Sequence, residues 1–233
     1  VILKPPPENV QELYLESLQA IGIDLSKHDI KLEEDNWESP TLGAAGVGWQ
    51  GTMDGMEISQ FTYFQSMGGV ELKVVPVELT YGLERICMFV NDIKNIFDIP
   101  WARAAWAPGG FVPYRAIRAR AEREQSVYSF EEADVAAHRR LFDHAEGEAL
   151  RLLGREGTGD GANAPAPLLL PAYERVLEAS HLFSVRDARR ALSVTERQGM
   201  IQRIRRLAVL CAKAWLDSET AAGAPAAAAE NLS

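Results

Sequence analysis

The sequence has few cysteines and no long apolar segment. Among its 233 residues only Cys87 and Cys211 are cysteines, and neither has a histidine or second cysteine at a metal-ligand spacing. Both lie in apolar helical patterns and are predicted to be buried, reduced thiols, which favours a cytoplasmic protein. The longest apolar run, LAVLCAKAWL, is interrupted by Lys213 and is too short to cross a bilayer, so we expect no membrane partner.

The chain also lacks excess positive charge and a phosphate-binding loop. Its formal net charge is −9, so any contact with RNA requires a local basic patch. No GxxxxGK motif occurs, which excludes a P-loop ATPase. The histidines share no metal-ligand spacing and are interpreted as surface or capping residues: His28, His138, His144 and His181.

What is present is an ordinary globular composition, with 47% hydrophobic and 24% charged residues. The first half mixes strand and helix patterns and the second half is helical, so the predicted fold class is α+β. We expect domains at 1–123 and 124–218, the second containing a flexible linker at 154–168, and a disordered tail at 219–233.

The first half has both kinds of hydrophobic periodicity. Helices are predicted at about 8–21 and 83–91, and strands at about 29–32, 56–65 and 73–80. The Gly- and Trp-rich stretch 33–55 is predicted to be a loop, whereas 101–123 shows no clear pattern.

Helix-start signals divide the second half. Ser129 with Glu132 predicts a capping box for a helix to about 153. Two helices are expected at 172–183 and 186–192, the latter starting behind Ser184. Ser193 with Glu196 predicts a second capping box for a helix at 195–218.

The strand–turn–helix in VELTYGLER carries candidate chemistry. Strand alternation places Glu78 and Thr80 on one face, and Gly82 allows a sharp turn. Arg85 then lies in the first helical turn, where free N–H groups favour an anion. A substrate with an ammonium at one end and a phosphate nearby would suit this arrangement. The alternative is a strand-to-helix corner with a surface Glu–Arg pair.

Two further segments add candidate residues. Glu57 and Gln60 lie in a predicted strand, where a carboxylate can hold Mg²⁺ on a polyphosphate. Ideal alternation puts them on opposite faces, so their cooperation requires a bulge or strong twist. Trp37 lies in a loop whose prolines and glycines suit a rigid pocket wall, or it is a core aromatic residue.

Many ordered strings then point to one family. NVQELYLESL, HDIKLEEDNWESPTLGA, DGMEISQFTYFQ, VELTYGLERI, LPAYERVLEASH and DARRALSVTERQ together resemble the alpha subunit of bacterial heterotetrameric glycyl-tRNA synthetase. The resemblance implies the class II synthetase fold, an antiparallel sheet with flanking helices. It also implies that glycine is activated with ATP and Mg²⁺ and passed to tRNA(Gly). The implied partners are a second alpha chain and the beta subunit, in an alpha2-beta2 assembly.

The resemblance also implies roles for individual residues. Arg85 matches the arginine of class II motif 3, which binds the ATP γ-phosphate and counts as the catalytic residue. Glu57 and Gln60 match the pair at the ATP–Mg²⁺ site, with Glu57 as the metal ligand. The glycine pocket is implied at Trp37, Glu78 and Thr80.

Some features depart from the family pattern. Gln50 and Thr52 replace a Glu and a Trp, and 113–122 matches only at its edges. Motif 1 and most of motif 2 are expected to precede Val1, so the chain alone is expected not to catalyse exchange between ATP and pyrophosphate. The rival interpretation is a non-catalytic, synthetase-like relic that binds a partner or a nucleotide.

A cluster of arginines in the last two helices has two interpretations. It is either a solvated face with local ion pairs or a contact surface for tRNA or the beta subunit. Its members are Arg186, Arg189, Arg190, Arg197, Arg203, Arg205 and Arg206.

Overall fold

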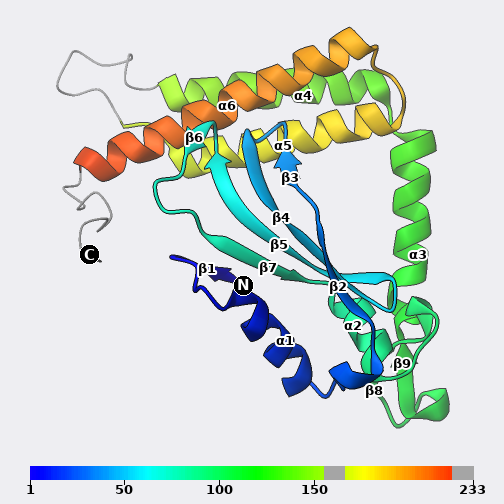
Figure 1. Cartoon of the computed structure of the whole chain (residues 1–233). Helices are drawn as coiled ribbons and strands as arrows, with labels where there is room; N and C mark the ends of the chain where they lie inside the picture. Colours follow the sequence, from blue (N-terminus) through cyan, green and yellow to red (C-terminus); the bar gives the residue numbers. More distant parts are fainter. Residues whose placement is uncertain (155–165, 222–233) are drawn as a thin grey trace. The chain divides into compact units, whose positions relative to one another are not determined.

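The computed structural model describes residues 1–154 and 166–221, and it confirms the α+β class (Figure 1). The strands are β1 (Ile2–Leu3), β2 (Ile30–Glu34), β3 (Trp37–Ser39), β4 (Ala44–Met53), β5 (Met56–Met67), β6 (Val70–Glu71), β7 (Val77–Tyr81), β8 (Pro100–Arg103) and β9 (Phe111–Pro113). The helices are α1 (Val10–Ala20), α2 (Leu83–Val90), α3 (Tyr114–Val127), α4 (Val135–Leu153), α5 (Leu169–Ala188) and α6 (Val194–Ala221).

The chain forms two compact units. The first contains 1–37, 46–64 and 75–127, and the second contains 38–45, 65–74 and, of the described residues, 128–154 and 166–221. Within the described residues, the main sheet has the order β1-β7-β5-β4-β2, with β3 paired to β4 and β6 paired to β5. The strand pairs β1–β7, β2–β4, β5–β6 and β5–β7 are antiparallel.

The core of the first unit lies between α1 and the sheet. Val10, Tyr14 and Leu18 repeat every four residues, so they form one buried stripe of the helix. Tyr14 packs edge-on against Phe61 of β5, with ring centroids 4.8 Å apart. Its hydroxyl accepts a hydrogen bond of 2.6 Å from the Ser59 hydroxyl, which satisfies both groups in the core.

The predicted loop at 33–55 is wrong, because β3 and the whole ten-residue strand β4 lie within it. Glycine in general weakens a strand, so the glycines of β4 led to the prediction of a loop. They are required by close packing on β5: a Cβ at Gly48 would lie 1.8 Å from the carbonyl oxygen of Phe61.

The segment without a clear pattern forms the β8–β9 hairpin and then α3. The guanidinium of Arg118 lies over the ring of Trp101, 5.6 Å from its centroid. Arg115 pairs with Asp98 before the hairpin. These contacts tie α3 to the hairpin within the first unit.

The second unit is built on α4, α5 and α6, which pack against one another (Figure 1). Its core consists of small and apolar side chains from the three helices: Phe142, Ala145, Ala149, Leu152, Ala172, Val176, Ala179, Leu182, Phe183, Met200, Ile204, Leu207, Ala208 and Cys211. The segments 38–45 and 65–74 join this unit, and Arg205 donates a 2.8 Å hydrogen bond to the carbonyl oxygen of Pro40.

Two of the predicted helix starts are wrong. Ser129 lies in a π-helical turn, Tyr128–Glu132, and α4 is capped instead by Asp134, whose carboxylate accepts from the N–H groups of Ala136 and Ala137. Ser184 starts no helix, because α5 continues through it and its hydroxyl donates to the carbonyl oxygen of Ser180.

The capping box at the start of α6 is confirmed. The Glu196 carboxylate accepts from the N–H and hydroxyl of Ser193, and the N–H of Glu196 donates to that hydroxyl. The central part of the predicted linker, 155–165, and residues 222–233 of the predicted tail lie outside the described residues. The predicted start of the tail at 219 is wrong, because α6 continues to Ala221.

Three predictions about burial differ in outcome. Cys211 is buried, and burial raises the pKa of its thiol, whereas Cys87 is only half-buried. His138 is buried rather than a surface residue, and its Nδ1 donates to the carbonyl oxygen of Asp134.

No helix in the described parts of the chain is long and apolar enough to span a membrane.

Candidate active site

The candidate residues of β7 lie on one face of the sheet. Val77 and Leu79 are buried in the core with α1, so strand alternation directs Glu78 and Thr80 to the opposite face. Glu78 is half-buried and Thr80 is exposed. This confirms the predicted common face of the two polar side chains.

The neighbouring strand extends this polar face. In the β5–β7 register Gln60 pairs with Thr80, and Thr62 pairs with Glu78. Directly opposite residues of antiparallel strands share a face, so all four side chains belong to one polar strip. Thr62, which is buried, was not predicted as a site residue.

Asp35 is a second residue near this strip that was not predicted from the sequence. Its carboxylate accepts a 2.9 Å hydrogen bond from the side-chain amide of Gln60. The bond fixes the orientation of Gln60 next to Thr80. The only sequence signal was its position two residues before Trp37, in a segment predicted to be a loop.

Trp37 is half-buried at the start of β3. Its ring packs edge-on against Phe64 of β5, with centroids 5.4 Å apart. By alternation along β5, Phe64 has the same orientation as Gln60 and Thr62. Trp37 is thus an aromatic neighbour on the face that carries the polar strip, compatible with a pocket wall and with a packing residue.

Arg85 lies where β7 turns into α2. Gly82 permits the turn: its N–H donates a 2.7 Å hydrogen bond to the carbonyl oxygen of Ile58, and a Cβ there would lie 3.1 Å from that oxygen. Arg85 reaches back to β5, where its Nη1 donates to the Glu57 carbonyl oxygen at 2.6 Å and to Oε2 at 3.4 Å. The turn therefore brings together the predicted γ-phosphate ligand and the predicted metal ligand.

The Arg85–Glu57 pair is accessible to a ligand. The side chains are 49% and 43% exposed, so the pair contributes little to stability by itself. Both groups retain unused hydrogen-bonding capacity: Arg85 has two further donor nitrogens, and Glu57 Oε1 accepts no hydrogen bond from the described residues.

The donor set fits Mg²⁺ that arrives with a polyphosphate. No group of three or more Asp, Glu, His or Cys residues is arranged to hold a metal in the described parts of the chain. Mg²⁺ at nucleotide sites usually takes one or two carboxylates and fills its remaining positions with phosphates and water. One accessible carboxylate beside a guanidinium meets that requirement.

Glu57 and Gln60 make separate contacts. Gln60 bonds to Asp35, whereas Glu57 bonds to Arg85. The β5–β7 pairing is regular from Ser59 to Tyr63, a range that contains Gln60 but not Glu57. The candidate residues thus form a polar strip and an adjacent Arg–Glu corner.

The two residues that depart from the family pattern lie on β4. Gln50 pairs across the strands with Glu33 of β2, and their side chains lie 3.5 Å apart. Thr52 is buried opposite Lys31. Both substitutions are accommodated within the β2–β4 pair.

Comparison with known proteins identifies the class of protein to which the site belongs. A family model described as glycyl-tRNA synthetase alpha subunit matches residues 1–220. The glycine–tRNA ligase alpha subunit of Coprothermobacter proteolyticus is 50% identical over 216 residues, which is 93% of this chain and 68% of that protein. Both matches place the chain among the aminoacyl-tRNA synthetases. Within that class it belongs to the glycyl-tRNA synthetase alpha subunit family, as the resemblance predicted.

Proposed function

We propose that the chain takes part, within a glycyl-tRNA synthetase alpha subunit, in the activation of glycine for ligation to tRNA(Gly), with ATP and Mg²⁺. A carboxylate oxygen of glycine attacks the α-phosphorus, the bond from that phosphorus to the bridging oxygen breaks, and pyrophosphate leaves. A tRNA hydroxyl then attacks the glycyl carbonyl carbon, and AMP leaves. The observation that carries this proposal is the juxtaposition of the Arg85–Glu57 corner with the polar strip in a chain of this family.

The Arg85–Glu57 corner is the proposed binding site for the phosphates of ATP. Arg85 would bind the γ-phosphate through its planar fork, which suits a phosphate better than a point charge does. Glu57 would hold Mg²⁺, and the metal would neutralise charge on the phosphates. The 3.4 Å contact between the two side chains supports this assignment, because a metal–polyphosphate complex requires both groups at one place.

The polar strip is the proposed binding site for glycine. The Glu78 carboxylate would pair with the glycine ammonium, and Thr80 would line the pocket beside it. Trp37 would close the space that a larger side chain needs. Gln60, proposed at the ATP–Mg²⁺ site, lies opposite Thr80 and between the two ends of the site.

None of these side chains needs to transfer a proton in the first step. The nucleophile is already a carboxylate at neutral pH, so the protein contributes alignment and stabilisation of charge in the transition state. This explains why the candidate set contains no histidine or cysteine.

The proposed partners are glycine, tRNA(Gly), the beta subunit and a second alpha chain, in an alpha2-beta2 assembly in the cytoplasm. The net charge of −9 supports the assignment of most tRNA binding to the beta subunit.

The test is glycine-dependent exchange of pyrophosphate into ATP, measured on the full-length alpha chain together with the beta subunit. In Glu57→Gln the Mg²⁺ concentration for half-maximal exchange should rise at least tenfold, because a neutral amide is a poor Mg²⁺ ligand. Glu84→Gln is the matched control, an exposed glutamate of α2 next to Arg85, and should leave the Mg²⁺ dependence unchanged. Binding of ATP without any exchange in the unaltered assembly would favour the non-catalytic rival.

A further inference from the structure

The helical unit contains a pocket that the proposed active site does not use. Its volume is about 210 Å³, and its walls come from α4, α5 and α6 with the turn before α6. The lining residues are Arg139, Arg186, Leu192, Glu196, Gly199, Met200 and Arg203. Three arginines thus face one small space.

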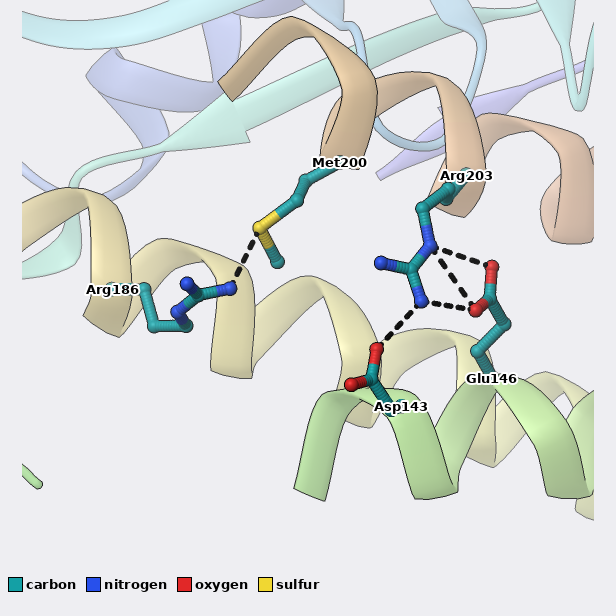
Figure 2. Close-up of polar contacts among 5 residues, drawn as sticks. All are labelled: Asp143, Glu146, Arg186, Met200 and Arg203. Carbon is teal, nitrogen blue, oxygen red and sulfur yellow. Dashed lines mark hydrogen bonds and ion pairs between the residues drawn. The ribbon is translucent and has the colours of Figure 1, made fainter. Parts of the chain in front are cut away.

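Arg186 is the most unusual of them. It is only 7% exposed, and its Nη1 donates to the thioether sulfur of Met200 at 3.0 Å (Figure 2). Its Nε is buried and has no hydrogen-bond partner within the described residues. Burial lowers the pKa of Arg186, and the nearby charge of Arg139 lowers it further. A buried guanidinium without an oxygen acceptor is costly, and a thioether is a weak acceptor.

The carboxylates near Arg186 are committed to other donors. Asp143 and Glu146 both bind Arg203, with Asp143 at 2.7 Å from its Nη2 and Glu146 on both Nε and Nη2. Glu196 is held by the capping box with Ser193. Figure 2 shows the remaining terminal nitrogen of Arg203 turned away from both carboxylates, on the side where Arg186 and Met200 lie.

Arg139 provides the second cation that is available to a ligand. Its side chain is exposed and makes no hydrogen bond or ion pair in the described parts of the chain. The pocket therefore combines a buried guanidinium that lacks an oxygen acceptor with an exposed guanidinium at its rim.

Size and geometry indicate the class of ligand. The volume of the pocket corresponds to that of about seven water molecules. It is smaller than the volume of pockets that usually bind drug-sized ligands. It fits a single small group. Guanidinium forks match the spacing of phosphate oxygens, and converging arginines favour a group with more than one negative charge.

We propose that this pocket binds one phosphate group, with Arg186 as its main ligand and Arg139 at the rim. The group is either inorganic phosphate or a phosphate of an RNA backbone. The site shares no residue with the proposed ATP and glycine sites, so it does not depend on the proposed function.

The experiment follows the Met200 methyl resonance by NMR in the full chain labelled with ¹³C-methyl methionine, assigned by its loss in Met200→Leu. Potassium phosphate is titrated against potassium chloride of equal ionic strength. We expect a saturable shift of this resonance, with half-saturation on the order of 1 mM, a typical weak-site affinity. Acetate should not reproduce it.

Three variants assign the shift to the pocket. In Arg186→Met, which keeps a long apolar side chain, the saturable shift should disappear. In Arg139→Gln, an exposed change that should not impair folding, half-saturation should rise several-fold. Arg206→Gln is the control, an exposed arginine of α6 outside the pocket, and should titrate as the unaltered chain does. If Arg186→Met does not fold, Arg139→Gln alone decides the matter.

Some outcomes would overturn the proposal. These are a shift that rises linearly without saturation, a titration unchanged in Arg139→Gln, or an equal response to acetate. An RNA hairpin added to the phosphate-saturated chain separates the two sources. Displacement of phosphate from the Met200 signal assigns the site to an RNA phosphate, and no displacement assigns it to free phosphate.

Discussion

Gln60 of β5 lies directly opposite Thr80 of β7, two pairs along the strands from Thr62 and Glu78, with the Phe61–Leu79 pair between them. This register places a carboxylate, an amide and two hydroxyls on the face that α1 leaves uncovered. The opposite face carries Leu79 and Phe61 of the core. One strand pair therefore separates core side chains from Gln60, Glu78 and Thr80, which are at least partly exposed on the other face.

The first prediction concerns Glu78. In the alpha–beta assembly, Glu78→Gln should raise the KM for glycine by about 10- to 100-fold, because a hydrogen bond to a charged group contributes about 1.5–3 kcal/mol. The KM for ATP should change little. Steady-state exchange kinetics with each substrate varied in turn would measure this.

Glu71→Gln is the matched control, since Glu71 is an exposed glutamate on β6 away from the polar strip. It should alter neither constant. An equal loss for both substrates in Glu78→Gln would place this carboxylate outside the glycine pocket.

The second prediction concerns Arg85. Arg85→Ala should raise the KM for ATP more than the KM for glycine. In Arg85→Lys the KM for ATP should lie between those of the unaltered enzyme and Arg85→Ala, because an ammonium lacks the planar fork of the guanidinium. A purely structural Arg85 predicts a different result: at most about 1 kcal/mol of stability lost with the exposed Glu57 pair, and normal ATP kinetics. Thermal melts and ATP titrations on the same preparation distinguish the two.

The strand–turn–helix could be predicted from sequence because its signals are local. Alternation fixed the common face of Glu78 and Thr80, and Gly82 marked the turn before Arg85. The pairing of Gln60 with Thr80 could not be predicted, because the register between β5 and β7 depends on how the intervening chain folds. Asp35 was missed for the same reason, since it reaches Gln60 only through the tertiary fold.

The wrong predictions arose where a weak local signal met a stronger alternative. The Ser129–Glu132 spacing matches a capping box, but the carboxylate of Asp134 binds two free N–H groups at the start of α4. Ser184 resembles a cap, yet its hydroxyl bonds within α5. β4 was not predicted because it contains several glycines, which have low strand propensity. Propensity does not show that a glycine such as Gly48 is required by the close contact between β4 and β5.

The third prediction concerns Arg190, just beyond the end of α5. Its φ is 53°, a left-handed conformation in which a side chain is strained, and its N–H bonds to the carbonyl oxygen of Asp187. Arg190→Gly should raise the free energy of unfolding by about 0.5–1 kcal/mol, because glycine adopts this conformation without strain. Arg190→Ala removes the same side chain but keeps a Cβ, so it should give no such gain. Denaturant melts of both would test this, and equal stabilisation would mean that loss of charge, not relief of strain, is the cause.

The last prediction compares two glycines in otherwise regular structure. At Gly48 a Cβ would lie 1.8 Å from the carbonyl oxygen of Phe61, a backbone atom that cannot move without breaking the β4–β5 pairing. Gly48→Ala should therefore destabilise the first unit severely, by more than about 3 kcal/mol, or prevent its folding. At Gly147, inside α4, a Cβ would meet no atom within 4 Å, so Gly147→Ala should stabilise the chain by about 0.5–1 kcal/mol. The same substitution thus has opposite expected signs at two sites, which urea denaturation monitored by circular dichroism can resolve. A mild effect at Gly48 would mean that β4 does not approach β5 this closely, and close approach would then no longer explain the glycines of that strand.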